Sequence, residues 1–263
     1  MDPRSPDRRR FLQAFTGLLA FGGVSATASA SAPGETRIRL ALNGHFPPLN
    51  FFDDQEQLHG LLVDELRLMA SAAGVTLDFV DLPWARGQKM VRRGELDALC
   101  TIPTRERRAY ALFAPTPLFV EESVLICRAD DRRITATSTP DDIQALKIAE
   151  PLGTGWVKDY FHGSQVVWSS DVDNILSMIE AGRVDGTFFG RSGAEIALAG
   201  FAHADRLRMV SFPMIPHDEG YCFGLRKTFP GAADLVARID GVLQEQTASG
   251  AFDAIRARYL PHD

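Results

Sequence analysis

The sequence predicts an α/β fold. Apolar runs typical of strands alternate with segments of helical periodicity from about residue 36 to residue 260. Glycine follows several of the helical segments, as is common at helix C-termini. The chain has 263 residues, of which 45% are hydrophobic, so it can bury the core of one large domain or of two small ones.

A first series of elements precedes residue 128. Thr36–Leu42 alternates apolar and polar residues before it runs apolar, which predicts a strand, and the two prolines in 44–50 indicate a loop. Leu61–Ala73 has an apolar face at helical spacing, which predicts a helix. The series continues with strands at 75–80, 96–101 and 120–127 and with a helix at 85–93 that Gly94 ends.

A polar stretch at 128–142, in which charged residues lead into a Thr/Ser/Pro run, separates this series from a second one. The second series again alternates strands and helices, which predicts a second α/β unit. Its strands are expected at 147–149, 165–168, 184–189, 207–211 and 220–225, and its helices at 155–161, 173–181, 192–199, 232–249 and 251–259.

Two helix-to-strand turns resemble one another. GELDA at 94–98 and GRVDG at 182–186 each follow a strand and a helix and lead into a strand. This weak internal similarity is compatible with two lobes of like design. The alternative is that Gly-x-hydrophobic-Asp is a common helix-to-strand turn without further meaning.

Residues 1–32 have the composition of an export signal. Arg8 and Arg9 precede Phe11 and Leu12, a weakly apolar stretch follows, and the small residues SATASASA at 25–32 suit cleavage. The arginine pair resembles a twin-arginine signal, and an ordinary arginine-rich secretory signal is the alternative. Both predict export to the periplasm, and the lack of a cysteine after the apolar stretch argues against a lipid anchor.

Charge and composition exclude several classes of partner. A net charge of -6 argues against nucleic acid as the main partner, because such binding requires a dense basic face. The six histidines are scattered, and the three cysteines match no zinc pattern, so neither a metal nor a cofactor is expected. An odd number of cysteines leaves at least one unpaired within the chain.

Several motifs follow one another in a familiar order. FPPLNF at 46–51 precedes a helix start, GLLVDEL at 60–66, and Pro83-Trp84 precedes the helix that ends in GELDA. TRER at 104–107 and YALF at 110–113 come next, and GTG at 153–155, GRVD at 182–185 and GAFDAI at 250–255 follow in the second half. In this order, over nearly all of residues 36–260, the chain resembles the bacterial extracellular solute-binding proteins of family 3, the receptors for polar amino acids and similar solutes.

The resemblance implies the type II fold of periplasmic binding proteins. In that fold two α/β lobes, each a mixed sheet flanked by helices, are joined by two hinge strands, and the ligand binds in the cleft. The first lobe is then expected at 33–125 together with 221–263, and the second at 126–220. Cys127 and Cys222 would lie on or near the hinge strands, where they either form a disulfide or remain two buried thiols.

The resemblance also places a ligand site around the TRER motif. Arg107 is expected to bind the carboxylate of the ligand, because a guanidinium can donate two parallel hydrogen bonds to it. Thr104, in the same motif, is expected beside the ligand. The alternative is that Arg107 belongs to a solvated charged turn with Arg105 and Arg108.

The GTG loop supplies a second part of this site. Thr154 and Gly155 precede a predicted helix, whose free N–H groups and positive dipole end favour an anion. Glycine also lets a ligand approach the backbone closely. The alternative is an ordinary helix cap by Thr154.

Phe46 and Trp84 are expected to form aromatic walls of the cleft, where they would cover the apolar part of a ligand or stack on a cation. Core packing is the alternative for both. Asn43 matches a position that often carries a polar ligand contact, and it can instead cap its own loop.

Two positions depart from the family pattern. Ile102 stands where a hydroxyl residue usually precedes the key arginine, and Gly190, followed by Arg191, stands where amino-acid receptors carry the aspartate that neutralises the ligand's ammonium group. A buried ammonium without a partner is costly. A standard amino acid therefore requires another carboxylate, such as Glu195 or Asp218. If Arg191 faces the cleft, two arginines would instead suit a ligand with two anionic groups; if it points to solvent, they would not.

The sequence therefore predicts a monomeric periplasmic receptor that binds a small carboxylate-bearing solute and delivers it to the permease of an ABC transporter. One alternative is an enzyme on the same scaffold, similar to cyclohexadienyl dehydratase, for which Glu150 and His45 are the candidate acid–base residues. Another is a periplasmic sensor or partner protein that reports its ligand to a signalling or redox protein.

Overall fold

The computed structural model describes residues 36–135, 138–155, 157, 165–211 and 220–260. All described residues belong to one compact region of the chain, 35–263. The predicted export signal at 1–32 lies outside the described residues, as does most of the helix expected at 155–161. Among the residues described, no helix combines the length and the apolar character that crossing a bilayer requires.

The first sheet combines strands from both ends of the sequence, in the order β5-β1-β6-β13-β7. β1 (Thr36–Leu42) pairs in parallel with β5 (Val75–Asp81) along its whole length and with β6 (Ala98–Thr101) at its end. β13 (Cys222–Arg226) joins this sheet antiparallel, between β6 and β7 (Ala111–Phe113). The sheet is therefore mixed, and together with the helices that pack against it, it forms the first unit.

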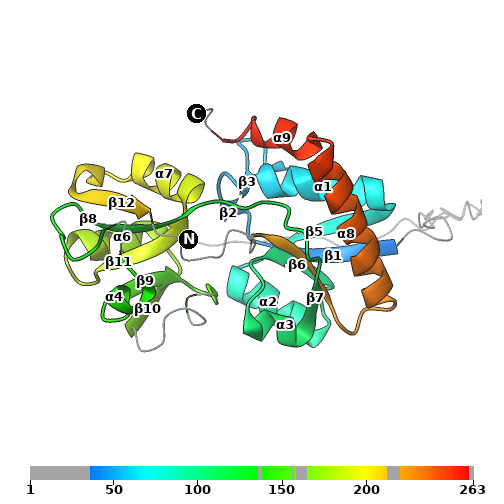
Figure 1. Ribbon diagram of the computed structural model, residues 1–263, viewed down its shortest axis with the longest axis horizontal. Coiled ribbons are helices and arrows are strands. Elements are labelled where there is room, and N and C mark those ends of the chain that lie inside the picture. Colours follow the sequence, from blue (N-terminus) through cyan, green and yellow to red (C-terminus); the bar gives the residue numbers. More distant parts are fainter. Residues whose placement is uncertain (1–35, 136–137, 156, 158–164, 212–219, 261–263) are drawn as a thin grey trace, which may run out of the picture. The chain divides into compact units, whose positions relative to one another are not determined.

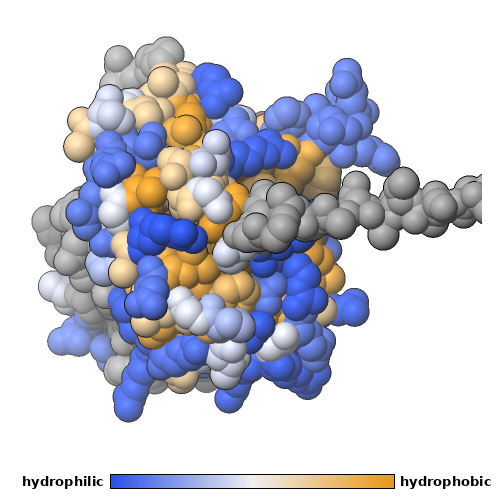
Figure 2. Space-filling view, turned by 90° about the vertical axis from the view of Figure 1, so that its right-hand side faces the viewer, coloured by the Kyte–Doolittle hydropathy of each residue, from blue (hydrophilic) through white to orange (hydrophobic). Residues whose placement is uncertain are grey.

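Helices from opposite ends of the chain cover this sheet. α1 (Leu61–Ala73) and α8 (Ala232–Ala248) pack against one another and share one hydrophobic core with the strands. Figure 1 shows this arrangement, with the cyan α1 beside the orange α8 and the red α9 (Ala251–Arg256). A smaller apolar cluster lies under α2 (Trp84–Arg93), and the short α3 (Arg105–Tyr110) follows β6. On the face shown in Figure 2, hydrophilic side chains surround a more hydrophobic central area.

The second sheet is built from the middle of the sequence, in the order β10-β9-β11-β8-β12. β8 (Ser123–Arg128) lies antiparallel between β11 (Gly186–Gly190) and β12 (Leu207–Ser211), and its first five residues are buried. β9 (Lys147–Pro151) pairs in parallel with β10 (Gln165–Ser169) and with β11. The accompanying helices are α4 (Pro140–Ile143), α6 (Val172–Glu180), α7 (Arg191–Gly200) and the 3-10 helix η1 (Ala204–Arg206). With this sheet they form the second unit.

The chain crosses between the two sheets twice, and the crossing segments pair with one another. The first crossing links β7 to β8, and the second returns from β12 to β13. Tyr221 donates its N–H to the carbonyl oxygen of Phe119 at 2.8 Å, and its own carbonyl oxygen accepts from Leu118 at 2.8 Å. Two mixed sheets flanked by helices and joined by two adjacent crossings are the predicted fold.

A small three-stranded sheet extends the first unit. Its strands are β2 (His45–Phe46), β3 (Asn50–Phe52) and β4 (Leu58–His59), in the order β2-β3-β4. Phe46 of β2 packs against the core clusters of both large sheets and stacks on Phe189 of β11, with 6.4 Å between ring centroids. This side chain therefore links the two sheets beside the crossing segments.

The two similar turns noticed in the sequence also have similar structures. Gly94 and Gly182 both adopt the left-handed conformation, with φ of 78° and 67°. In each turn the following aspartate binds arginine: Asp97 pairs with Arg39 and Arg226, and Asp185 pairs with Arg133.

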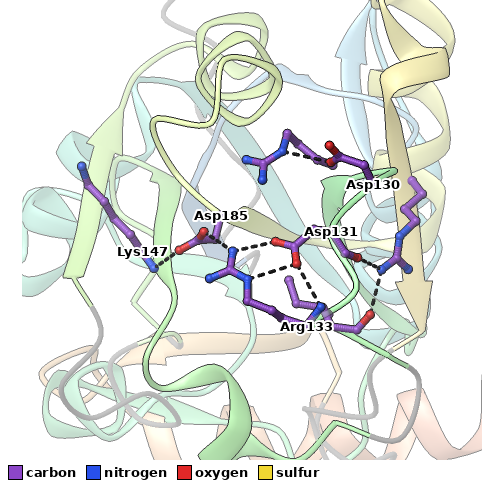
Figure 3. Close-up of polar contacts among 8 residues, drawn as sticks. Asp130, Asp131, Arg133, Lys147 and Asp185 are labelled. Atoms are coloured by element: carbon purple, nitrogen blue, oxygen red, sulfur yellow. Dashed lines mark hydrogen bonds and ion pairs between the residues drawn. The ribbon is translucent and has the colours of Figure 1, made fainter.

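In Figure 3, Arg133 lies between Asp131 and Asp185, and Asp185 also accepts from the backbone N–H of Lys147 at 2.8 Å. The guanidinium of Arg133 therefore joins the segment after β8 to the turn before β11. Asp97 is buried and Asp185 is partly buried, and carboxylates withdrawn from water require such partners, so these turns have a structural role in each sheet.

The predicted strands and helices that fall within the described residues agree with the observed ones apart from their ends. The loop expected at 44–50 was wrong in part, because His45–Phe46 and Asn50 belong to strands of the small sheet. The short elements α3, β7 and α4 were not predicted. The strand expected at 120–127 begins at Ser123, because residues before it belong to the crossing segment, where Val120 is 38% exposed. The last helix, expected at 251–259, ends at Arg256.

Candidate ligand-binding site

A cavity of about 640 Å³ lies between the two sheets, beside the crossing segments. From the first unit its wall takes the end of β1, the start of α2 and the end of β6. From the second unit it takes the loop after β9, the start of α6 and the end of β11. Both crossing segments contribute as well, through Glu121 and Tyr221. A solute in this cavity would contact both units at once.

Arg107 lies in the wall of this cavity and is only 2% exposed. Its Nε donates to Oε1 of Gln88 at 2.9 Å, Nη1 to the carbonyl oxygen of Ile102 at 2.8 Å, and Nη2 to the carbonyl oxygen of Gly153 at 3.1 Å. The guanidinium is also placed over the ring of Trp84, 5.5 Å from its centroid. These contacts fix its plane, so the alternative of a solvated charged turn does not describe Arg107.

Thr104 supports Arg107 through the backbone. It is the N-cap of α3, and its hydroxyl accepts from the backbone N–H of Arg107 at 3.2 Å. A capping hydroxyl satisfies a donor that the first helical turn leaves open. Thr104 is 3% exposed and is not part of the cavity wall, so the structure places it behind Arg107.

The GTG loop approaches the first unit very closely. Gly153 has φ +94°, and a Cβ there would lie 2.9 Å from Trp84 and 2.9 Å from Gln88. A Cβ at Gly155 would be 3.5 Å from Nη2 of Arg107, and Thr154 contributes to the cavity wall. Glycine at 153 therefore meets both a conformational and a steric requirement.

Trp84 and Gln88 lie on the same face of α2, four residues apart. Trp84 contributes to the cavity wall and packs against the cluster under α2. Gln88 accepts from Arg107 and donates its Nε2 to the carbonyl oxygen of Gly153 at 2.9 Å. The sequence interpretation missed Gln88, although its spacing from Trp84 on a helix was a usable signal.

Phe46 and Asn43 both line the cavity, and each also has the local role considered as its alternative. Phe46 packs against both cores, and Oδ1 of Asn43 accepts from the backbone N–H of His45 at 3.3 Å. Ile102 also lines the cavity, and its contribution to Arg107 is a backbone carbonyl oxygen in place of a hydroxyl.

Gly190 and Arg191 differ in their relation to the cavity. Gly190 is part of its wall, but Arg191 is not. Nε of Arg191 donates to Glu122 at 2.6 Å, Nη2 donates to Ser211 at 3.0 Å, and Nη1 lies 3.7 Å from Glu195. The structure therefore does not bring a second arginine to Arg107. Glu195 is occupied by Arg191, and Asp218 lies outside the described residues.

Two residues of the cavity wall, Glu121 and Tyr221, lie on the crossing segments and were not predicted from the sequence. The carboxylate of Glu121 accepts from the hydroxyl of Ser192 at 2.6 Å and from its backbone N–H at 3.1 Å. Burial raises the pKa of Glu121 above its usual value, and the hydrogen bonds from Ser192 oppose this shift. Burial also raises the pKa of the Tyr221 hydroxyl, and the charge of Glu121 adds to the shift while Arg107 opposes it.

The candidate acid–base residues of the enzyme alternative do not form a pair. Glu150 is fully buried in β9, outside the cavity wall, and its Oε1 accepts from the backbone N–H of Phe188 at 2.9 Å. Burial raises the pKa of Glu150 to about 8. His45 lies in the cavity wall but is exposed.

None of Cys100, Cys127 and Cys222 forms a disulfide, so Cys127 and Cys222 are not joined. The two lie in different sheets, Cys127 in β8 and Cys222 in β13. Cys100 lines the cavity, and burial raises its pKa well above the usual value. Within the described ranges, no group of three or more His, Cys, Asp or Glu side chains is placed to hold a metal ion.

Comparisons with known proteins agree with this architecture. A curated relative, the "Probable amino-acid ABC transporter-binding protein" of Haemophilus influenzae, is 25% identical over 177 residues, which are 65% of this chain and 67% of the relative. A solved histidine kinase sensor domain with similarity to periplasmic binding proteins has 21% identity and a TM-score of 0.70, and the match covers 86% of this chain and 96% of that one. An ancestral amino acid-binding protein that is a precursor of cyclohexadienyl dehydratase has 18% identity and a TM-score of 0.65 over 86% of this chain and 95% of that one.

The two structural matches show the shared fold. Residues 38–262 match the family described as "Bacterial extracellular solute-binding proteins, family 3", which is most of the chain. The fold, the cavity between two sheets and this match lead to one conclusion: the chain belongs to the family 3 bacterial extracellular solute-binding proteins.

Proposed function

We propose that this chain is a periplasmic receptor that captures a small carboxylate-bearing solute, an amino acid or a related organic acid, for an ABC transporter. The buried guanidinium of Arg107 in the cavity wall carries this proposal. The acceptors described for Arg107 are neutral oxygens of Gln88, Ile102 and Gly153, whereas a carboxylate can accept two parallel, charge-assisted hydrogen bonds from a guanidinium. The stacking of Arg107 on Trp84 and its bond to Gln88 orient it before the solute arrives.

The loop 153–155 is the second part of the proposed carboxylate site. The carbonyl oxygen of Gly153 accepts from both Arg107 and Gln88, so in this structure it holds a position next to the guanidinium. A carboxylate that binds Arg107 would compete with this carbonyl. Binding would then change the contact between the loop and the first unit, which is one way for a solute to shift a hinge equilibrium.

The rest of the solute is expected to be largely apolar at its surface. Many side chains in the cavity wall are apolar or aromatic, among them Phe46, Trp84, Leu152 and Phe189. Such walls favour burial of a hydrocarbon or ring portion, and the few polar groups fix orientation. A cavity of about 640 Å³ is within the size range of small-ligand sites.

The proposed domains follow the two sheets. Residues 33–125 and 221–263 would form one lobe, 126–220 the other, and 1–32 the export signal. The permease of an ABC transporter is the proposed partner, because the curated relative from Haemophilus influenzae carries the name of a transporter-binding protein. A monomer is proposed as the acting form.

The two acid–base candidates of the enzyme alternative, Glu150 and His45, do not meet in the described part of the site. The buried Glu150 lies outside the cavity wall and is bonded to the backbone of β11. A sensor would bind its ligand at the same site, so a binding experiment tests the site in both roles. Genetic experiments are needed to identify the downstream partner.

The test is a thermal shift assay on the purified protein with amino acids, dicarboxylates, keto acids and aromatic acids. A ligand at a hundred times its Kd adds about 2.7 kcal/mol, which should raise the Tm by roughly 5–10 °C. Arg107→Gln should abolish the shift, and Arg108→Gln, an exposed neighbour outside the cavity wall, should keep it. A shift that survives in Arg107→Gln would place the carboxylate elsewhere.

A further inference from the structure

Glu121 occupies the space that a side chain at position 190 would fill. A Cβ built on Gly190 would lie 1.9 Å from Oε1 of Glu121 and 2.2 Å from its Cδ. Both residues are part of the cavity wall. The carboxylate therefore crosses the end of β11 and reaches the cavity from the first crossing segment.

The bonds of Glu121 leave one oxygen available to the cavity. Oε2 accepts both hydrogen bonds from Ser192, at 2.6 Å and 3.1 Å. Oε1 accepts none from the described part of the chain, and no Arg, Lys or His there forms an ion pair with Glu121. A mostly buried carboxylate without a cation is unfavourable, and its raised pKa reflects that environment.

Among the described residues of the cavity wall, Arg107 is the only arginine or lysine, and Glu121 is a carboxylate without a cationic partner. Arg107 supplies the cation, and the charges of both Arg107 and Glu121 act on the hydroxyl of Tyr221. Asp81, another acidic residue in the wall, is exposed to solvent, whereas Glu121 is partly buried, and one oxygen of Asp81 accepts from the backbone N–H of Gly44 at 2.8 Å. Glu121 is therefore the carboxylate best placed to accept a cationic group of a solute held by Arg107.

We propose that Glu121 binds the ammonium group of a zwitterionic solute whose carboxylate binds Arg107, and that Gly190 is a glycine because Glu121 needs its space. This inference rests on the proposed function. In this inference the residue that selects for an amino group is Glu121 on the crossing segment, and not a side chain at position 190, Glu195 or Asp218. Truncating one partner of a buried charge pair is costly, so Glu121 should decide between an amino acid and its deamino analogue.

The experiment measures the affinity of the purified protein for the twenty L-amino acids and for the deamino carboxylic acid of each, by calorimetry. The wild-type chain should bind at least one amino acid at least 30-fold more tightly than its deamino analogue. Glu121→Gln should remove most of this preference, because a neutral amide cannot balance an ammonium. Its affinity for the deamino acid should change less than about threefold.

Glu122→Gln is the matched control. It removes the neighbouring carboxylate, which pairs with Arg191 and lies outside the cavity wall, so the amino preference should stay. Thermal melting of each variant identifies any that fails to fold.

A double variant tests where the ammonium group binds by restoring the amino preference instead of removing it. Gly190 has φ -66° and ψ 146°, which an aspartate can adopt. Gly190→Asp alone should bind weakly, since two carboxylates then meet, whereas Glu121→Ser combined with Gly190→Asp should regain the amino preference to within about tenfold. A double variant that binds no more tightly than Glu121→Ser would overturn the assignment.

The outcomes separate the two proposals. If the protein binds neither the amino acids nor their deamino analogues, the proposed function fails and this inference fails with it. If it binds the acids through Arg107 but Glu121→Gln keeps the wild-type preference for the amino group, only the inference is overturned.

Discussion

Oε1 of Gln88 accepts the hydrogen bond from Nε of Arg107 at 2.9 Å, so an amide on α2 fixes the orientation of a guanidinium on α3. The same amide donates to the carbonyl oxygen of Gly153, at the edge of the other unit. Gln88 therefore holds together the cation of the proposed site and the loop that approaches it.

Gln88→Ala should weaken binding of the solute identified by thermal shift roughly 10-fold, because Arg107 loses the acceptor that orients it. Calorimetry measures the affinity, and Lys89→Ala, at an exposed position on the same helix, is the control for helix propensity. Equal affinities of Gln88→Ala and Lys89→Ala would show that the amide has no part in binding.

Gly153→Ala should lower the free energy of unfolding by more than about 1 kcal/mol, since φ is +94° and the new Cβ would meet Trp84 and Gln88 at 2.9 Å. Gly241→Ala is the opposite control, because it lies in α8 with no atom within 4 Å of its Cβ and should be neutral or stabilising. Urea unfolding compares the two, and equal effects would contradict the close approach of the loop.

The stability of the wild-type protein should fall relative to Glu150→Gln as the pH rises from about 4.5 to about 8. The folded state raises the pKa of Glu150 from 4.5 to about 8, so the folded protein holds a proton that the unfolded chain has released. The stabilisation is complete below the unfolded pKa and is lost through this window, at about 1.4 kcal/mol per pH unit at most.

Urea unfolding at several pH values measures this difference. Glu65, whose pKa is also raised to about 8, titrates in both proteins and cancels in the comparison. A difference between the two proteins that is constant from pH 5 to pH 8 would mean that Glu150 does not titrate in this range.

Arg256→Met should destabilise the protein by roughly 3 kcal/mol at about pH 9, above the pKa of about 8 of Glu65, because it then removes the cationic partner of this fully buried carboxylate, 2.9 Å away. Adding Glu65→Gln to this variant should restore part of the loss, since no buried carboxylate then remains unpaired. A double-mutant cycle in urea checks this, and strictly additive losses would refute the coupling.

The longer strands and helices could be predicted from the sequence because they depend on local patterns, whereas short elements such as β2, α3 and β7 span too few residues to show a periodicity. The alternation in Thr36–Leu42 and the apolar face of Leu61–Ala73 decide strand and helix by themselves, and both ranges have the predicted bounds. Segment ends were less certain, because the start of β8 at Ser123 depends on where the chain enters the second sheet.

The site was only partly predictable because it depends on contacts between distant segments. Arg107 and Trp84 have motifs of their own, but Glu121 has none, and its position over Gly190 depends on the packing of the crossing segment against β11. Arg191 looked equally suited to a ligand in the sequence. Its ion pair with Glu122 follows from the neighbouring positions of β11 and β8 in the sheet, which the sequence pattern does not give.

The backbone pairing of Phe119 with Tyr221 has a mechanical consequence. The pairing joins the two crossing segments to one another. Glu121 is two residues from Phe119 in the first segment, and Tyr221 is itself the paired residue of the second. When the two units rotate about the crossing segments, groups on these segments move least. A solute bound to Glu121 would keep this contact during opening and closing. Its contacts with groups farther from the crossing segments, such as Arg107 and the loop at Gly153, would form and break.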